Sequence, residues 1–287
     1  MKPDVKAFFD ENTNTVTYVV SDPVGKVCAV IDPVLDFDQA SGRLSTASAD
    51  EVLEYVSEQH LEVAWILETH AHADHLSALQ HLKKKTGGRT AIGRFITRTQ
   101  AIFKGIFNLG DEFQADGKQF DRLLDDGDEL ELGRLRIHVM HTPGHTPACL
   151  AYLIGDVAFV GDTLFMPDFG TARVDFPGGD AATLYRSIQR IFELPADTRL
   201  FMCHDYKAPG RDQYAWESTV HEQRTNNIHI HAGTSEQEFI EFRTQRDAKL
   251  AMPKLILPSI QVNIRAGCMP PADDNGVVYL RLPLDTL

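Results

Sequence analysis

Residues 69–75 read Thr-His-Ala-His-Ala-Asp-His, and the fold of the chain is best worked out from this stretch. It brings three imidazoles and a carboxylate close together, and neutral imidazole nitrogens and ionised carboxylates are common ligands of divalent metal ions. The mostly apolar run 64–68 precedes it, and leucines at helical spacing follow it in 76–82. The stretch therefore lies at a strand-to-helix junction, where α/β proteins build their sites. A surface loop that is merely rich in histidine is the alternative interpretation.

Composition limits the class of protein and the kind of partner. With 287 residues, of which 43% are hydrophobic, the chain can bury a large core, as one domain with additions or as two smaller ones. The formal net charge of −13 argues against nucleic acid or an anionic membrane as the main partner. An anionic small molecule would therefore need a local basic patch.

Cysteine usage and the N-terminal residues bear on the compartment. The cysteines are scattered and form no Cys-x-x-Cys pair, which favours reduced thiols: Cys28, Cys149, Cys203 and Cys268. The first residues lack the apolar segment of a secretory signal, so we expect a cytoplasmic protein. An organelle protein without its transit peptide would have the same features.

Candidate ligands follow several apolar strands. Besides 64–68, a hairpin over 129–132 and 135–140 leads to His145, and a second hairpin over 150–154 and 157–160 leads to Asp162. A last buried strand, 200–203, ends at His204. The ends of neighbouring strands meet at one edge of a sheet, so this order favours a single site.

The other expected elements come from periodicity and turn residues. His229 and His231, in Asn-Ile-His-Ile-His, are expected at the surface. The expected elements are an antiparallel meander over 5–9, 15–20 and 27–31, a polar loop over 36–46, a helix with Ser48 as N-cap, a helix over 75–86, a strand beginning at 89–97, a helix over 181–194, a polar helical region over 212–251, and an irregular tail after 254.

The candidate ligands resemble, in order, the motifs of the metallo-β-lactamase superfamily: His70-x-His72-x-Asp74-His75, Thr-Pro-Gly-His145-Thr, Gly-Asp162-Thr and His204. The match spans roughly residues 5 to 206. It implies an α/β fold, the four-layer αββα sandwich, with the metal site at one edge between the sheets. We then expect a metallo-β-lactamase-like domain over 1–210, with 211–287 as a C-terminal extension packed on it. Without the resemblance, the sequence predicts only mixed α/β structure with a metal site.

In that superfamily the motifs form two metal sites that share the equivalent of Asp162. The implied ligands here are His70, His72 and His145 for one site, and Asp74, His75 and His204 for the other. All these positions are filled. A dinuclear zinc hydrolase, similar in pattern to the glutathione thioester hydrolase glyoxalase II, is therefore one alternative.

The stretches 171–179, 183–185, 191–195 and 204–206 look like those of the persulfide dioxygenases. That family oxidises glutathione persulfide with O2 to sulfite and glutathione. The resemblance implies one Fe(II) per chain, bound by His70, His145 and Asp162, with three open positions for a sulfur ligand and O2. The remaining histidines and aspartate of the motifs would orient the ligands. This is the expected function, and the iron ligands are the expected catalytic residues.

Arg173 and Tyr206 are the candidate substrate contacts. A planar guanidinium suits a glutathione carboxylate, but an ion pair of Arg173 with Asp175 or Asp168 is the alternative. The loop between Asp162 and Arg173 is longer than in animal persulfide dioxygenases, which indicates the bacterial subgroup. Tyr206 is expected to donate to the substrate or to have its hydroxyl in water. A metal or thiol sensor on this fold is a third function class, and a homodimer is compatible with the sequence.

Overall fold

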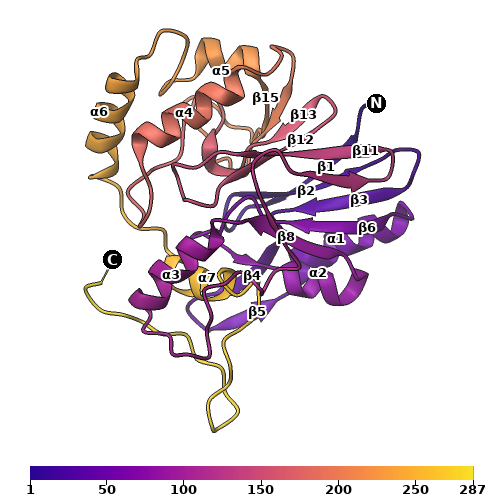
Figure 1. Ribbon diagram of the computed structural model, residues 1–287, viewed down its shortest axis with the longest axis vertical. Helices are drawn as coiled ribbons and strands as arrows, with labels where there is room; N and C mark the ends of the chain where they lie inside the picture. Colours follow the sequence, from indigo (N-terminus) through magenta and orange to yellow (C-terminus); the bar gives the residue numbers. More distant parts are fainter. Residues whose placement is uncertain (287) are drawn as a thin grey trace.

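The computed structural model describes residues 1–286 as two six-stranded sheets that lie face to face (Figure 1). The first sheet contains, in spatial order, β1 (Asp4–Asp10), β2 (Thr15–Ser21), β3 (Val27–Ile31), β6 (Glu62–Leu67), β8 (Arg89–Gly93) and β9 (Arg122–Leu124). The second contains β10 (Glu129–Leu132), β11 (Leu135–His141), β12 (Leu150–Ile154), β13 (Val157–Phe159), β14 (Arg199–Phe201) and β15 (Glu217–Thr219). A small third sheet has the order β5 (Arg43–Ser45), β4 (Val34–Asp38) and β7 (Leu76–Ser77).

Helices cover the outer face of each sheet, so the molecule has four layers (Figure 1). On the side of the first sheet lie α1 (Ala47–Glu58), α2 (Leu79–Thr86), α3 (Ile96–Ile106) and α7 (Ile256–Asn263). On the side of the second lie α4 (Ala181–Phe192), α5 (Val220–Asn226) and α6 (Glu236–Asp247). The expected αββα sandwich is confirmed.

Three apolar clusters hold these layers together. The middle one joins the inner faces of the two sheets and includes Tyr18, Leu67 and Phe159. A second packs the first sheet on its helices, and a third packs the second sheet on α4, α5 and α6. Burial of apolar surface is the main favourable term in folding, and here it is divided among three layer interfaces.

Strand pairing explains why the ligand motifs meet. β3, β6, β8 and β9 run parallel, and so do β13 and β14, so their carboxyl ends lie at the same edge of each sheet. The motif 69–75 follows β6, Asp162 follows β13, and His204 follows β14. His145 lies in the connection between β11 and β12. The expected hairpins and the N-terminal meander are confirmed.

Several expected boundaries are wrong. The segment 36–46 is not a loop throughout, because β4 pairs with both β5 and β7. The next helix begins at Ala47, and the Ser48 hydroxyl donates to Asp36 instead of capping the helix. The helix expected over 75–86 begins only at Leu79, because 76–77 form β7. The strand that starts at Arg89 ends at Gly93, and α3 follows it.

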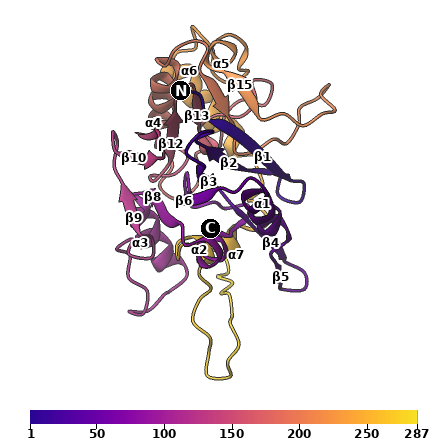
Figure 2. The ribbon, with the colours of Figure 1, turned by 90° about the vertical axis from the view of Figure 1, so that its right-hand side faces the viewer.

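The C-terminal segment contains more regular structure than expected. α7 includes Pro258 in its first turn, where the missing N–H costs nothing, although the tail was expected to be irregular. The extension adds β15 to the second sheet and helices to both outer faces, since α5 and α6 pack beside α4 whereas Val262 of α7 belongs to the cluster of the first sheet. After α7 the chain projects from the body as a long loop (Figure 2). Over residues 1–286, no helix is both long and apolar enough to cross a bilayer.

Gly144, just before His145, packs directly on α4. Its φ is +136°, and a Cβ at this position would lie 2.3 Å from the Leu184 Cα. We expect Gly144→Ala to lower the free energy of unfolding by about 2 kcal/mol or more, through overlap and backbone strain. Gly42→Ala is the matched control, because Gly42 also has positive φ (+68°) but nothing within 4 Å, so about 1 kcal/mol is expected. Urea unfolding measures both; equal losses would mean that the contact with Leu184 relaxes.

Candidate metal centre

The loop after β6 is anchored by a buried carboxylate from the neighbouring strand. Asp32, directly after β3, accepts the Thr69 N–H at 2.7 Å and the Thr69 hydroxyl at 2.8 Å. Its Oδ1 also lies 3.0 Å from His72 Nε2. The backbone of Asp32 is left-handed, with φ +51°, so a strained residue is held in place by these bonds. The start of the histidine motif is therefore fixed against β3.

Three of the expected ligands converge beside this loop. The ligand atoms of His70, His145 and Asp162 all lie within 4.8 Å of one another, and the three side chains are buried. Asp162 Oδ2 lies 3.9 Å from His70 Nε2 and 3.6 Å from His145 Nε2. Two imidazoles and one carboxylate thus face a common point.

Hydrogen bonds on the far side of each ring orient these imidazoles. His70 Nδ1 lies 3.0 Å from the Thr69 hydroxyl, and His145 Nδ1 lies 2.7 Å from the Arg173 carbonyl oxygen. Each Nε2 is left facing Asp162, as metal-binding histidines require.

The unpartnered atoms at this point fit a metal ion. His70 Nε2 is buried and has no hydrogen-bond partner among the described residues, and the same is true of Asp162 Oδ1, the carboxylate oxygen nearer His204. Leaving buried polar atoms unpaired is costly, and a bound cation would satisfy them. Burial lowers the pKa of His70 well below its ordinary value, so its imidazole is neutral. Burial alone would raise the pKa of Asp162, but the nearby imidazole of His204 holds it well below its usual range. A neutral imidazole and an ionised carboxylate are the forms that bind metals. The structure therefore contains a His/Asp metal-binding site.

A second set of candidate ligands shares Asp162. His204 Nε2 lies 3.2 Å from Asp162 Oδ1 and 3.2 Å from Asp74 Oδ2. On its other side, His204 Nδ1 lies 3.2 Å from the Thr15 hydroxyl and 3.3 Å from the Asn14 carbonyl oxygen. Asp162 is thus positioned between two groups of side chains, one on each carboxylate oxygen.

His72 and His75 lie in the same buried cluster but make other contacts. His72 Nε2 lies near two carboxylates, 3.0 Å from Asp32 and 3.3 Å from Glu68. Its Nδ1 and His75 Nε2 have no hydrogen-bond partner within residues 1–286, and His72, Asp74 and His75 form a separate group of potential ligands. His75 Nδ1 lies 3.0 Å from the Leu76 carbonyl oxygen. The site therefore has ligand atoms for one metal ion at His70, His145 and Asp162, with further groups beside it.

Three residues of this centre were not singled out from the sequence. Asp32 and Glu68 both contact His72, and burial raises the pKa of Glu68 to about 7. Asn263, in α7, donates to the carbonyl oxygens of His72 and His75, at 2.8 Å each. The position of Asp32 directly after an apolar strand was a usable signal. No sequence signal pointed to Asn263, because it is far from the motif along the chain.

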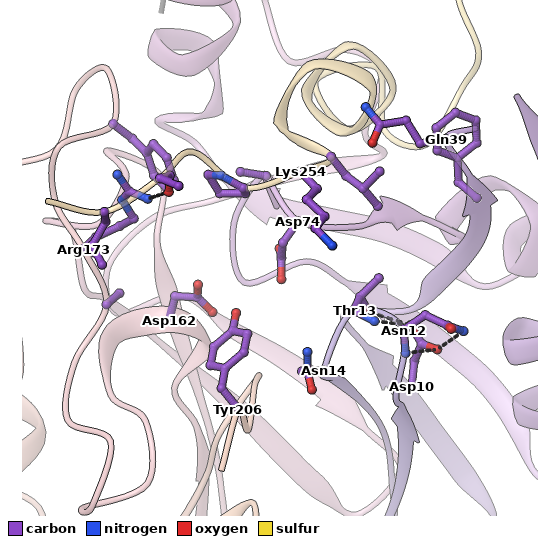
Figure 3. Close-up of a pocket in the computed structure, with 18 of the residues that line it drawn as sticks. Asp10, Asn12, Thr13, Asn14, Gln39, Asp74, Asp162, Arg173, Tyr206 and Lys254 are labelled. Atoms are coloured by element: carbon purple, nitrogen blue, oxygen red, sulfur yellow. Dashed lines mark hydrogen bonds between the residues drawn. The ribbon is translucent and has the colours of Figure 1, made fainter. Parts of the chain in front are cut away.

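A cavity of about 990 Å³ opens over Asp162, Asp74 and His145. Figure 3 shows Asp162, Asp74 and Tyr206 around the same space. The Tyr206 side chain is 40% exposed, and its ring stacks on His204 with centroids 5.6 Å apart. Both of the expected alternatives for Tyr206 stay open with this geometry.

Arg173 also lines the cavity, but its guanidinium is already engaged. It forms a bidentate pair with Asp175, with both N–O distances 2.6 Å, and it donates to the Ala251 carbonyl oxygen at 2.6 Å. This is the ion pair that was the alternative to substrate binding.

His229 is buried, although the sequence predicts it at the surface, whereas His231 is exposed as expected.

Comparison with known proteins agrees with the site and the fold. The sequence-family model described as "Metallo-beta-lactamase superfamily" matches residues 11–204, which contain all the expected ligands. The chain belongs to the metallo-β-lactamase superfamily. It is 55% identical over 294 aligned residues to a "Probable metallo-hydrolase" of Burkholderia pseudomallei, covering 99% of both chains.

More distant relatives in the superfamily carry different names. The chain is 47% identical to "Glyoxylase B2" of Dictyostelium discoideum, over 100% of this chain and 98% of the other. It is 30% identical to human mitochondrial persulfide dioxygenase ETHE1, over 93% and 90%. The crystal structure of ETHE1 from Myxococcus xanthus superposes with a TM-score of 0.73 at 30% identity, covering 92% of this chain and all of that one.

Two histidines of the motif test the ligand set. His70 Nε2 faces Asp162, whereas His72 Nε2 contacts Asp32. We expect His70→Ala to leave the protein largely metal-free, and His72→Ala to keep substantial metal, with a roughly 10- to 100-fold loss in affinity. Metal per chain, measured on both variants prepared identically, checks this. Equal loss from the two would mean that both histidines bind the same ion, as in the two-metal arrangement.

Proposed function

We propose that the protein is a mononuclear non-haem iron dioxygenase that oxidises glutathione persulfide with O2 to sulfite and glutathione. The observation that carries this proposal is the group of two imidazoles and one carboxylate formed by His70, His145 and Asp162. Such a triad leaves open positions on an iron ion and is typical of iron(II) oxygenases. The similarity to human persulfide dioxygenase and to the Myxococcus xanthus structure supports it.

The overall reaction consumes one persulfide, one O2 and one water, and it yields one glutathione and one sulfite. The terminal sulfur is oxidised, O2 is reduced, and the sulfur–sulfur bond breaks. Bound iron(II) would supply the redox chemistry. The protein's contribution is to hold the ligands: the Thr69 hydroxyl and the Arg173 carbonyl oxygen keep the His70 and His145 rings turned toward Asp162.

Substrate binding requires positive charge near the cavity, because glutathione carries two carboxylates. Of the cations that line it, Arg173 and Arg243 are engaged by aspartates. Arg43, Arg246 and Lys254 also line it, and none of the three forms an ion pair within residues 1–286. The Lys254 side chain points into the cavity on the side of Asp74 (Figure 3). We therefore assign Lys254, Arg246 and Arg43, ahead of Arg173, as the carboxylate contacts.

A dinuclear zinc hydrolase acting on a glutathione thioester is the second candidate. The specific observation in its favour is His204, which lies 3.2 Å from Asp162 and from Asp74, so a second ion has ligands available. The similarity to "Glyoxylase B2" is consistent with this candidate. Paired metals would generate a hydroxide near neutral pH and polarise the thioester carbonyl.

Oxygen uptake and metal analysis on the same preparation test the two candidates. Protein purified without added metal should contain one iron per chain and consume O2 when glutathione persulfide is added, with sulfite as product. Two zinc ions per chain, with thioester hydrolysis and no oxygen uptake, would reject the dioxygenase in favour of the hydrolase. Binding of metal with neither activity would favour a sensor.

Lys254 provides a prediction about substrate affinity. Lys254→Met should raise KM for glutathione persulfide about 10-fold or more, because a charge-assisted hydrogen bond contributes about 1.5–3 kcal/mol. kcat should change little, since the contact is with the non-reacting part of the substrate. Lys249→Met is the matched control, because Lys249 is exposed nearby but does not line the cavity. Steady-state kinetics measure both; an unchanged KM in Lys254→Met would remove Lys254 from the binding site.

A further inference from the structure

The segment 170–174 carries the hydrogen bond that orients one metal ligand. The Arg173 carbonyl oxygen lies 2.7 Å from His145 Nδ1. A carbonyl oxygen only accepts hydrogen bonds, so it fixes Nδ1 as the protonated nitrogen and leaves Nε2, which faces Asp162, free to bind a metal. The position of one backbone carbonyl therefore decides how His145 is presented to the metal.

Buried groups of the C-terminal extension hold the first residues of this segment. Asn227 Nδ2 donates to the Gly170 carbonyl oxygen at 3.0 Å, and the Thr171 N–H donates to His229 Nδ1 at 2.9 Å. Burial, together with the positive charge of Arg243, lowers the pKa of His229 to about 3, so His229 stays neutral and able to accept this bond. The segment is therefore fixed from its first residue.

Two residues of α6, Arg243 and Asp247, hold the rest of the segment; together they are called the α6 brace. Arg243 Nη1 donates to the Thr171 carbonyl oxygen at 3.0 Å. Asp247 Oδ2 accepts the Val174 N–H at 2.9 Å, while its Oδ1 accepts from Arg243 Nη2. The brace therefore forms hydrogen bonds to the backbone on both sides of Arg173, whose carbonyl oxygen accepts a hydrogen bond from His145.

The burial of the α6 brace indicates a role beyond stability. Arg243 is 1% exposed and Asp247 is 3% exposed. Removing two charges from water is costly, and a buried ion pair often stabilises a protein no more than apolar residues of the same shape. Apolar residues could not form the two hydrogen bonds of this pair, from Arg243 to the Thr171 carbonyl oxygen and from the Val174 N–H to Asp247. The geometry of the segment is therefore the property that this pair determines.

We propose that Arg243 and Asp247 are positioning residues of the metal centre, acting through the Arg173 carbonyl oxygen on His145. Both lie outside residues 11–204, the part of the chain that matches the superfamily. The C-terminal extension would then complete the metal site in addition to covering the second sheet. This proposal requires only that the centre binds a metal, so it is tested independently of the choice between dioxygenase and hydrolase.

Cobalt(II) bound to the full chain is the probe. Its unpaired electrons shift the NMR signals of ligand histidines, and a ring N–H held by a hydrogen bond exchanges slowly with solvent. His145 should give such a signal through the Arg173 carbonyl oxygen, and His70 should give another through the Thr69 hydroxyl. The Thr69 hydroxyl bonds to Asp32 and His70, and no hydrogen bond of the brace within residues 1–286 ends on Thr69, so the His70 signal serves as an internal reference.

Two variants remove the brace in different ways. Asp247→Asn keeps the shape but offers a single acceptor oxygen to two donors, Arg243 and the Val174 N–H. The double variant Arg243→Met/Asp247→Leu removes both charges together, so that no unpaired charge is left buried if the single variant does not fold. Phe239→Leu is the matched control. Phe239 lies on the same helix, is fully buried and packs on Tyr185, so its replacement lowers stability without removing a hydrogen bond to 170–174.

We expect the brace variants to lose or shift the His145 ring signal and to bind cobalt(II) about 10-fold more weakly. The His70 signal should keep its position in every variant. Phe239→Leu should keep both signals and bind cobalt(II) as the unmodified protein does. The proposal is overturned if the brace variants retain the His145 signal and the affinity, or if Phe239→Leu changes them as much.

Discussion

The buried carboxylate of Asp32 is the constraint on which the metal centre depends. It follows β3 and binds Thr69 through both the backbone and the hydroxyl, so it ties the end of one parallel strand to the loop after the next. The same hydroxyl faces His70 Nδ1, and the same carboxylate faces His72. A buried charge is tolerated only when its oxygens are satisfied, and here the partners that satisfy it are the residues that begin the ligand motif.

Much of the architecture could be predicted because the ligands follow strands. A parallel strand pair brings carboxyl ends together, so apolar runs that end in His70, Asp162 and His204 imply one shared edge even before the pairing is known. The prediction failed where local pattern and tertiary contact disagreed. Ser77 is extended rather than helical because β7 pairs with β4, and nothing in the residues around the motif encodes that pairing.

The supporting contacts could not be predicted, for a reason of distance along the chain. Asn263 binds the carbonyl oxygens of His72 and His75, and Asp247 binds the Val174 N–H. Each of these hydrogen bonds is made to a backbone atom. Because every residue has a backbone, the sequence contains no complementary residue type that would reveal the contact. α6 signals its own start through the capping box of Ser235 and Glu238, but not the surface on which it packs. The start of α6 could therefore be predicted from the extension's own residues, whereas α7 and the contacts of the extension with the metal centre could not.

The geometry around His204 is compatible with both kinds of metal centre proposed above. Its Nε2 lies 3.2 Å from a carboxylate oxygen of Asp162 and from one of Asp74, and two carboxylates so close together repel each other unless positive charge lies nearby. A proton on His204 meets that requirement, and so does a second metal ion. Asp162 meanwhile turns its other oxygen toward His70 and His145 in either case. A one-metal form and a two-metal form of this centre would thus differ only by the exchange of a proton for a metal ion beside His204, with every motif residue unchanged. The ordered motifs therefore identify the superfamily more readily than the reaction.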